Sequence, residues 1–478
     1  MAEVKTQNFK SASAKAVHDP NIQRALGAPF AHFVEGRRDA IDEDYSEESW
    51  DSMRDRAAAI KGHTIESLDY YLDLVDKNVR RNGGHVHFAD DADHANRIVL
   101  EIAKQHNVKT VIKSKSMVSE EMGINHFLEE NGIDPVETDL GEYIIQLADE
   151  TPFHIIGPAI HKTKEQVSEL FEKWLKTAPT HDIEELCIIA RDVLRDKFAQ
   201  ADMGISGANF IVAETGTVVL VTNEGNGRMT TSAPRVHVAI AGMEKLLPAL
   251  EDVALFLRLL PRSATGQRIT SYNTFVSGPR ARTDEDGPEE FHLILVDNGR
   301  LGLLADEVLR ESLSCIRCGA CLNHCPVYRK VGGHAYGWVY SGPIGAIVSP
   351  MLTNMEQSKD LPYASTLCGA CRDVCPVKID IPRLLLHLRH KLASSGANTW
   401  TERLAMRQWH SAMKTRKQLE GSARLGRLLL RPIIRNGYVK KLRAPVVGGW
   451  TDSRDFPAPA TKSFAQLWHD ELSGGGKN

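Results

Sequence analysis

Two cysteine-rich segments carry the clearest chemistry in this sequence. The first reads CIRCGACLNHCP and begins at Cys315, and the second reads CGACRDVCP and begins at Cys368. Within them, the decapeptides CGACLNHCPV and CGACRDVCPV lie 50 residues apart. A duplicated metal-binding loop is the simplest explanation of this repeat.

The spacing of the first segment suits a cubane iron–sulfur cluster. The run C-x2-C-x2-C-x3-C-P is found in bacterial two-cluster ferredoxins, where the last cysteine ligates the other cluster. Three thiolates two residues apart on a turning loop reach three iron corners of one cluster. Gly319 and Gly369 permit tight turns, and Pro326 and Pro376 fix φ beside the last ligand. The repeat therefore predicts two [4Fe–4S] clusters.

Cross-ligation assigns each cysteine to one cluster. The expected ligands of cluster 1 are Cys315, Cys318, Cys321 and Cys375, and those of cluster 2 are Cys325, Cys368 and Cys371. A full repeat would place an eighth cysteine at the position of Ser365. We therefore expect one iron of cluster 2 to be open to serine oxygen, water or a partner group, and to be lost on oxidation to a [3Fe–4S] form. The alternative is that Ser365 only caps the loop.

Zinc and disulfides are weaker explanations of these thiols. Structural zinc sites use four ligands, usually as two separated pairs. Two zinc ions would therefore need more ligands than the seven cysteines supply, and His324 would have to serve as a further ligand. Disulfides are rare in the cytoplasm. The eighth cysteine, Cys187, lies in the helix-like run EELCIIARDVL, where we expect a buried core thiol.

Length and composition indicate a large globular protein. The chain has 478 residues, of which 42% are hydrophobic and 25% are charged, which excludes disordered and collagen-like proteins. Such a length suggests roughly three domains. No run approaches about 18 consecutive apolar residues, so we expect no membrane-spanning helix. The N-terminus lacks the apolar core of a secretory signal, and we expect a cytoplasmic protein.

Charge is distributed unevenly along the chain. The net charge is −4, yet residues 376–445 hold 16 lysine and arginine residues and only three acidic ones, whereas residues 39–51 read DAIDEDYSEESWD. Such asymmetry suggests that the basic end meets an anionic surface. We interpret the basic region as amphipathic helices that dock a protein partner or make peripheral contact with the inner face of the membrane. A solvated helical face is the alternative.

The hydrophobic pattern divides the chain into four regions. They are a polar helical arm (1–62), an α/β domain (63–305), an α-helical ferredoxin-type two-cluster domain (306–395) and a basic helical C-terminal domain with an extended tail (396–478). Alternating helical and β-branched runs in the second region predict a largely parallel sheet. The expected helices are 63–81, 91–105 and 119–131, and the expected strands are 85–88, 109–113, 208–213, 216–222, 235–240 and 291–296. The closely spaced strands after residue 208 suggest some antiparallel pairing.

A candidate anion pocket lies in the α/β domain. Its four polar residues, which follow a predicted strand, are Lys113, Ser114, Lys115 and Ser116. Sheets of this class usually bind ligands at such strand ends. We expect Glu214, which joins two strands, and the glycine-rich loop 223–228 nearby; solvated strand ends and simple turns are the alternatives. The chain has neither GxxxxGK[ST] nor GxGxxG after a strand, so no nucleotide or flavin site is indicated.

With these motifs in hand, nearly the whole chain resembles the lactate utilization protein B family. The LUD domain of that family is similar to IKSKSMVSEEMGINHFLEENGIDPVETDLGEYIIQLADE and GISGANFIVAETGTVVLVTNEGNGR. Its ferredoxin module resembles CIRCGACLNHCPVY, SGPIGAIVSP and STLCGACRDVCPVKIDIP, and its C-terminal domain resembles WTDSRDFPAPATKSFAQLW. The resemblance implies a LUD fold similar to the sugar-isomerase and CoA-transferase superfamily, and two [4Fe–4S] clusters on seven cysteines.

The resemblance also implies one subunit of a system that oxidises L-lactate to pyruvate. The expected partners are a cysteine-rich protein similar to heterodisulfide-reductase-type subunits and a shorter LUD protein. We expect this chain to relay electrons as part of an oxidoreductase, with no catalytic residue assigned and the electron acceptor open. The alternative is an iron–sulfur regulator that binds nucleic acid through its basic tail, although no helix-turn-helix is recognisable.

Overall fold

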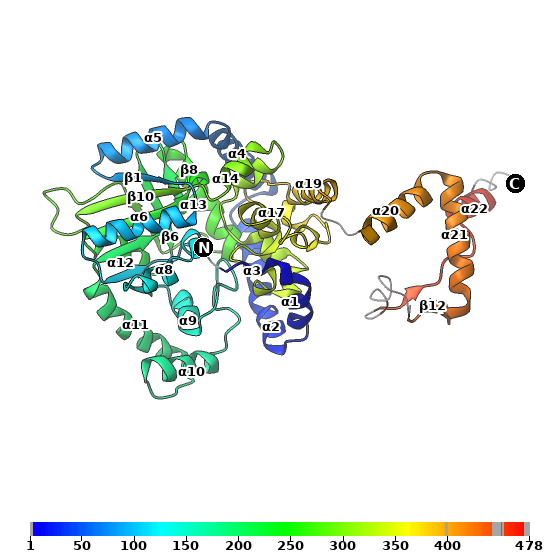
Figure 1. Ribbon diagram of the computed structural model, residues 1–478, viewed down its shortest axis with the longest axis horizontal. Helices are drawn as coiled ribbons and strands as arrows, with labels where there is room; N and C mark the ends of the chain where they lie inside the picture. Colours follow the sequence, from blue (N-terminus) through cyan, green and yellow to red (C-terminus); the bar gives the residue numbers. More distant parts are fainter. Residues whose placement is uncertain (1–2, 397–399, 442–450, 452–453, 473–478) are drawn as a thin grey trace. The chain divides into compact units, whose positions relative to one another are not determined.

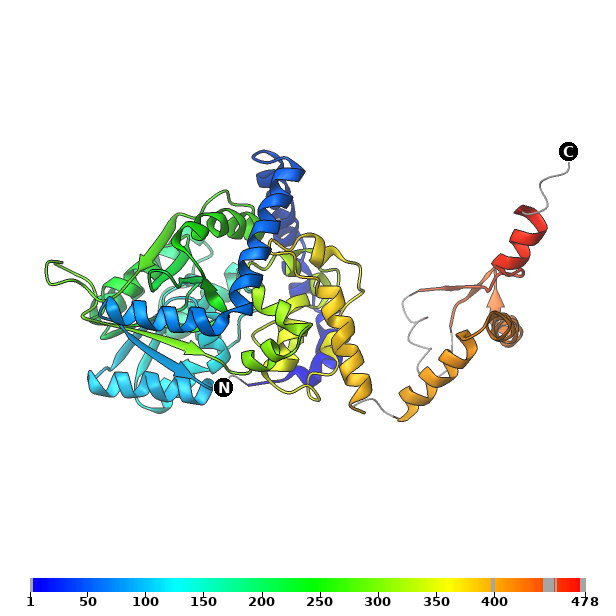
Figure 2. The ribbon, with the colours of Figure 1, turned by 90° about the horizontal axis from the view of Figure 1, so that it is seen from above.

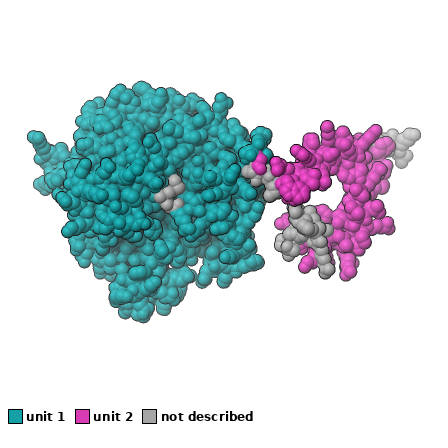
Figure 3. All heavy atoms as spheres, in the orientation of Figure 1, with its two compact units in different colours: residues 1–395 teal, residues 396–478 magenta. Residues whose placement is uncertain are grey.

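The chain folds into two compact units, Met1–Ser395 and Gly396–Asn478 (Figure 3). The structure is a computed structural model that describes residues 3–396, 400–441, 451 and 454–472. The division between the units falls where the sequence places the start of the basic C-terminal domain. Unit 1 contains both the α/β region and the two cysteine segments, so every expected ligand and pocket residue lies within one unit.

A six-stranded sheet organises unit 1 (Figure 1). The strand order is β1-β10-β7-β4-β2-β3, and all neighbouring strands are parallel. The strands are β1 (His85–Ala89), β2 (Thr110–Lys113), β3 (Asp134–Glu137), β4 (Met203–Ser206), β7 (Val236–Gly242) and β10 (Glu290–Val296). The predicted parallel sheet is confirmed. Because parallel strands run the same way, the loops that follow them meet at one edge.

Both faces of this sheet are buried by side chains that alternate along each strand. In β7, Val238 and Ile240 pack into a core with helix α6 (Ala92–Gln105) on one face. Ala239 and Ala241 of the same strand pack into a second core on the other face. Burial on both faces explains why β7 and β10 are apolar along most of their length.

A second, four-stranded sheet shares the second core with helix α5 (Leu68–Arg81). Its order is β8-β5-β6-β9; β5–β6 and β6–β9 are antiparallel, and β5–β8 is parallel. The strands are β5 (Phe210–Val212), β6 (Thr217–Thr222), β8 (Leu246–Leu247) and β9 (Tyr272–Val276). The antiparallel pairing expected after residue 208 is therefore present.

Eight further helices connect these strands and cover the sheet. They are α7 (Met117–Met122), α8 (Ile124–Glu130), α9 (Leu140–Ala148), α10 (Lys164–Leu175), α11 (Ile183–Gln200), α12 (Asn226–Ser232), α13 (Leu250–Thr265) and α14 (Arg300–Ala305). The expectation of a buried Cys187 is wrong, because this residue is exposed on α11. The buried stripe of that helix consists of Leu186, Ala190 and Leu194, and Cys187 lies off it.

The N-terminal arm packs on the cysteine region and is not a free extension. Its helices are α1 (Phe9–Ala16), α2 (Pro20–Ala25), α3 (Ala28–Asp42) and α4 (Glu47–Glu66). Lys5 N donates to Gly337 O (2.7 Å), and Gln23 Nε2 donates to Lys330 O (2.8 Å). Helix α4 runs across the boundary expected at 62/63, so the arm and the α/β domain share a helix.

The cysteine region is built from short helices, which lie beside the blue N-terminal helices in Figure 2. They are α15 (Ala320–His324), α16 (Tyr328–Val331), α17 (Gly342–Leu352), α18 (Ala370–Asp373) and α19 (Ile381–Ser394). Residues 342–350 of α17 are all buried. The apolar run in GPIGAIVSP therefore forms the core of this region.

The described residues of unit 2 form three α-helices and a small antiparallel sheet. Its elements are α20 (Trp400–Met413), α21 (Arg416–Leu430), β11 (Ile434–Arg435), β12 (Tyr438–Val439), β13 (Phe456–Pro457) and α22 (Phe464–Leu467). Helices α20 and α21 bury none of their residues, and large apolar side chains such as Trp409 and Leu428 are exposed. Among the described residues of both units, no helix combines the length and apolar character that crossing a membrane requires.

Candidate metal centre

The two cysteine loops share left-handed backbone positions at equivalent places in the repeat. Arg317 and Leu367, which precede the two CGAC sequences, have positive φ angles of 60° and 55°. Gly319 and Gly369 follow at 76° and 88°, in the left-handed region that favours glycine. The duplicated loop predicted from the sequence is therefore present in the structure.

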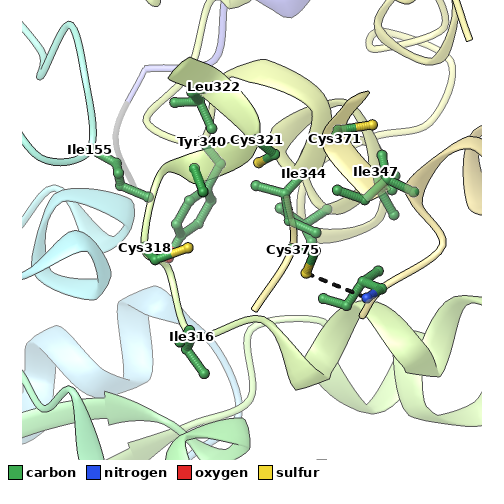
Figure 4. Packing of buried hydrophobic residues seen from close by; sticks show 14 of the residues in the cluster. Ile155, Ile316, Cys318, Cys321, Leu322, Tyr340, Ile344, Ile347, Cys371 and Cys375 are labelled. Atoms are coloured by element: carbon green, nitrogen blue, oxygen red, sulfur yellow. Dashed lines mark hydrogen bonds between the residues drawn. The ribbon is translucent and has the colours of Figure 1, made fainter. Parts of the chain in front are cut away.

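Four cysteines from the two loops line one small cavity. Figure 4 shows three of them, Cys318, Cys321 and Cys375, among the surrounding apolar side chains. Cys315, Cys318 and Cys321 belong to the first loop and to α15, and Cys375 belongs to the second loop. The rest of the cavity wall is largely apolar and includes Ile344 of α17. These four cysteines are the ones that cross-ligation assigns to cluster 1.

Because these four thiols line one cavity, their pKa values affect one another. Burial, and then the charge on Cys375, raises the pKa of Cys318. Burial, and then the charges on Cys315, Cys318 and Cys375, raise the pKa of Cys321 well above its ordinary value. Burial raises the pKa of Cys375 to about 11. Thiols that are held neutral in this way release their protons when they bind a metal.

The remaining three cysteines form a second group. Burial, and then the charge on Cys325, raises the pKa of Cys371 to about 12. Cys368 is exposed, and its pKa is lowered because the Thr366 side chain hydrogen-bonds its sulfur. The charge on Cys368 also acts on Cys325, and that on Cys371 acts on Cys321 of the first group. The two groups therefore adjoin each other.

Backbone N–H groups point at sulfur atoms of both cysteine groups. The donor and acceptor pairs, each separated by 3.4 Å, are Arg317 N and Cys315 Sγ, Tyr328 N and Cys325 Sγ, and Ile379 N and Cys375 Sγ. Hydrogen bonds of this kind stabilise cluster sulfurs and tune their potential. Soft thiolate donors in an apolar, hydrogen-bonded shell are the donor set that iron–sulfur clusters use. The residues present therefore fit such clusters.

Helix α4 fixes the position of the second loop. Arg54 Nε donates to Cys375 O (3.0 Å), and Arg54 Nη2 donates to Asp373 O (2.8 Å). Lys378 Nζ lies 2.8 Å from Asp51 Oδ2 on the same helix. No pattern in the sequence indicates that the acidic N-terminal region holds this loop, and we did not predict it.

Three family models match consecutive parts of the chain. They are the LUD domain (residues 72–296), the 4Fe-4S dicluster domain (residues 311–379) and the lactate utilisation protein B C-terminal domain (residues 389–473). The α/β region is therefore a LUD domain, and an iron–sulfur domain follows it. This second match favours iron–sulfur binding over the zinc and disulfide alternatives.

Curated relatives match the chain over most of its length. Lactate utilization protein B of Bacillus licheniformis is 43% identical over 98% of both chains. The chain belongs to the lactate utilization protein B family. Lactate utilization protein B of Shouchella clausii is 45% identical over 87% of both chains, and the "uncharacterized electron transport protein YkgF" of Escherichia coli is 42% identical over 96% of both chains. The resemblance seen in the motifs is confirmed.

The likeness to a solved structure is weaker. A crystal structure of a DUF162 family protein from Deinococcus radiodurans covers 48% of this chain and 98% of its own at 14% identity. Its TM-score of 0.28 is too low to equate the two folds. The expected likeness to the sugar-isomerase and CoA-transferase superfamily stays a prediction.

In this member of the lactate utilization protein B family, Ser365 caps its own loop. Leu367 N donates to Ser365 Oγ (3.1 Å), and Arg389 Nη2 donates to Ser365 O (3.3 Å). The structure therefore shows the capping role that was one of the two expectations for this residue. Coordination of iron by its hydroxyl oxygen stays a prediction.

A cavity of ≈ 590 Å³ lies at the carboxyl edge of the parallel sheet of the LUD domain. The predicted pocket residues that line it are Ser114, Lys115, Ser116, Asn223, Glu224 and Asn226. The structure thus brings the loop after β2 together with the glycine-rich loop far along the chain. Anion binding by this pocket stays a prediction.

Lys113 and Glu214 do not line this cavity. Lys113 ends β2 and is buried, with its Nζ 2.6 Å from Glu137 Oε1 and 3.2 Å from Glu120 Oε1. Burial alone would lower the pKa of Lys113, but these two carboxylates raise it. Glu214 Oε2 accepts a hydrogen bond from Leu250 N (3.0 Å) at the start of α13. Both residues are therefore paired within the fold, and their place in the predicted pocket is corrected.

Lys115 is also paired, although it lines the cavity. Its Nζ lies 2.9 Å from Glu142 Oε1 and donates to Ile156 O (3.1 Å). Burial, and then the charge on Asp139, raises the pKa of Glu224. Asp139 lines the cavity as well. This part of the pocket is therefore more acidic than the prediction from Lys113 and Lys115 suggested.

Two cations that line the cavity were missed in the sequence. Lys245 follows β7 at the carboxyl edge of the sheet, and Arg317 lies in the first cysteine loop. Burial lowers the pKa of Lys245 to about 8, although the Glu244 carboxylate opposes this shift. The strand-end rule that indicated Lys113 also applies to Lys245, so this residue was predictable. Nothing in the sequence connects Arg317 with the LUD domain.

Proposed function

We propose that this chain is an electron-transfer subunit that holds two [4Fe–4S] clusters. The observation that carries the proposal is the gathering of seven cysteines from two loops into two adjoining groups, within a 4Fe-4S dicluster domain. The proposed ligands are Cys315, Cys318, Cys321 and Cys375 for cluster 1, and Cys325, Cys368 and Cys371 for cluster 2. When bound, such clusters supply one-electron transfer. The chain itself buries most of the ligands, donates N–H groups to their sulfurs and keeps the two groups adjacent.

We assign this electron transfer to the oxidation of L-lactate to pyruvate. Support comes from relatives named lactate utilization protein B and from the Escherichia coli relative named as an electron transport protein. The proposed partners are a cysteine-rich protein similar to heterodisulfide-reductase-type subunits and a shorter LUD protein. None of the three matched family descriptions names a nucleic-acid-binding domain, so the regulator alternative has no support.

Growth on L-lactate tests the assignment. Deleting the gene in a host without another lactate oxidase should abolish growth on L-lactate and leave growth on pyruvate unchanged. A plasmid copy of the natural gene should restore growth, whereas a copy with Cys318→Ser should not. Normal growth of the deletion strain on L-lactate would reject the lactate assignment.

Brief exposure to air should damage cluster 2 before cluster 1. Cluster 2 has three cysteine ligands, of which Cys368 is exposed, whereas cluster 1 has four, of which three are buried. We expect a [3Fe–4S] EPR signal to appear before the iron content falls far. Ser365→Cys should suppress that signal by supplying a fourth thiolate. Equal damage to both clusters, or none, would reject the three-cysteine assignment.

Removing unit 2 should abolish the binding of partner subunits. Helices α20 and α21 expose apolar side chains in a strongly basic region, which suits a docking surface. A stop codon after Ser395 should prevent co-purification of the partners and leave the iron content unchanged, because all seven cysteines lie in unit 1. Sedimentation with anionic vesicles, with and without unit 2, tests the membrane alternative. Unchanged co-purification would contradict the docking role.

A further inference from the structure

The large cavity of the LUD domain shares a wall with the cysteine group assigned to cluster 1. Arg317 and Ile155 line both the ≈ 590 Å³ cavity and the small cavity among the four cysteines. The Arg317 guanidinium lies 4.5 Å from the centre of the Tyr340 ring, which also lines the large cavity. A molecule in the large cavity would therefore lie one side chain away from cluster 1.

Two largely buried cations on this wall have unused hydrogen-bonding capacity. The Arg317 side chain is 10% exposed, and its Nη1 has no hydrogen-bond partner among the residues that the structure describes. Its Nη2 lies 3.7 Å from Glu244 Oε1, which is long for an ion pair. Lys245 is 8% exposed, and its Nζ forms no hydrogen bond or ion pair with any residue that the structure describes. Buried donors without partners cost free energy, so both groups suit an anionic ligand.

One side of the cavity suits the body of an organic molecule, whereas the side that holds Asp139 and Glu224 is polar and acidic. Leu260, Pro261 and Ala264 of α13 line the cavity together with Ile156 and Ile160. A volume of ≈ 590 Å³ falls in the range of roughly 300–1,000 Å³ that is typical of sites for organic ligands. A three-carbon acid would leave most of this volume unfilled. The cavity therefore favours a larger molecule with an apolar part.

We propose that this cavity binds an organic carboxylate with an apolar body, and that Lys245 and Arg317 hold the carboxylate beside cluster 1. A carboxylate accepts hydrogen bonds from a guanidinium and an ammonium group together, and such charged pairs are strong when buried. The apolar body contacts the α13 side of the cavity. This inference rests on the proposed electron-transfer function only for the identity of the neighbouring cluster; the binding site itself does not depend on lactate.

Calorimetric titration of the anaerobically purified holoprotein tests this site. The probes are phenylpyruvate, which joins a carboxylate to an apolar ring, phenylacetone, which lacks the carboxylate, and pyruvate, which lacks the ring. Phenylpyruvate should bind most tightly. Lys245→Met should weaken phenylpyruvate binding by roughly tenfold or more, because it removes one charged hydrogen-bond donor, and should leave any binding of phenylacetone unchanged. Lys245→Arg, which keeps the charge, should restore most of the loss.

The matched control is Lys197→Met, which removes a lysine on α11 outside the cavity. It should bind phenylpyruvate as the natural protein does. In the reduced holoprotein, phenylpyruvate should also change the EPR line shape of cluster 1 and not that of cluster 2. No binding of either carboxylate, or binding that Lys245→Met leaves unchanged, would overturn the proposal. If the protein binds phenylpyruvate but the deletion strain grows normally on L-lactate, the assigned function is rejected and the binding site stands.

Discussion

Replacing Cys375 with serine is expected to remove cluster 1 and to leave cluster 2 in place. Cys375 comes from the second loop, yet it lines the small cavity with Cys315, Cys318 and Cys321 from the first. Two [4Fe–4S] clusters carry about eight iron atoms, so the iron content of Cys375→Ser should fall from about eight to about four per chain. Chemical iron and sulfide analysis of anaerobically purified protein measures this change.

Two other substitutions show whether the loss is specific. Cys187→Ser should leave the iron content unchanged, because Cys187 is exposed on α11 and belongs to neither cysteine loop. Cys371→Ser should also cost about four iron atoms, but from cluster 2, so its remaining EPR signal should differ from that of Cys375→Ser. If the two variants kept the same signal, or if Cys375→Ser lost all of its iron, the cross-ligation assignment would be wrong.

Replacing Arg300 with methionine should lower the free energy of unfolding of unit 1 by about 3–5 kcal/mol, the usual effect of breaking a buried ion pair. Arg300 Nη2 lies 2.9 Å from Glu121 Oε2, and its Nε lies 2.7 Å from Glu244 Oε2. All three side chains are about 1% exposed or less. Tyr340 OH, from the cysteine region, donates to Glu121 Oε2 (2.7 Å). The network therefore joins the LUD domain to the iron–sulfur domain.

The loss of stability follows from the buried carboxylates of Glu121 and Glu244, which would be left without their cation. Burial alone would lower the pKa of Arg300, but the Glu121 and Glu244 carboxylates raise it well above its ordinary value. Burial alone would raise the pKa of Glu244, but Arg300 and then Arg317 hold it at about 2. Urea denaturation of the anaerobic protein measures the change. The exposed Arg38→Met is the control and should shift the midpoint little; an equally small shift for Arg300→Met would contradict the structural role of the network.

The gathering of cysteines from the two loops was predictable because it depends on local spacing and on a repeat. The positions of β3 and β4 were not. β3 contains Pro135 and begins with an aspartate, and β4 reads MGIS with Gly204 in its centre. A Cβ atom at Gly204 would lie 1.9 Å from Thr230 O of α12. The glycine that makes this strand weak in the sequence is therefore required by the close approach of a helix that lies further along the chain.

Only part of the candidate pocket was predictable, because some of its residues are brought there by packing between distant segments. The strand-end rule placed Ser114, Lys115 and Ser116 at the cavity, because parallel strands end at one edge. It failed for Lys113, which belongs to the strand itself and meets Glu137 in the interior. Arg317 could not have been predicted, because its contact with the LUD domain depends on how the first cysteine loop packs against that domain.

Reduction of the clusters by L-lactate tests the central claim most directly. The chain should be purified anaerobically together with its proposed partner subunits, with every cluster oxidised at the start. Adding L-lactate should produce the EPR signals of the reduced clusters on this chain, and the Cys375→Ser complex should lack the signal of cluster 1. If dithionite reduces both clusters but L-lactate reduces neither, the chain does not carry electrons from lactate, and the proposed function is wrong.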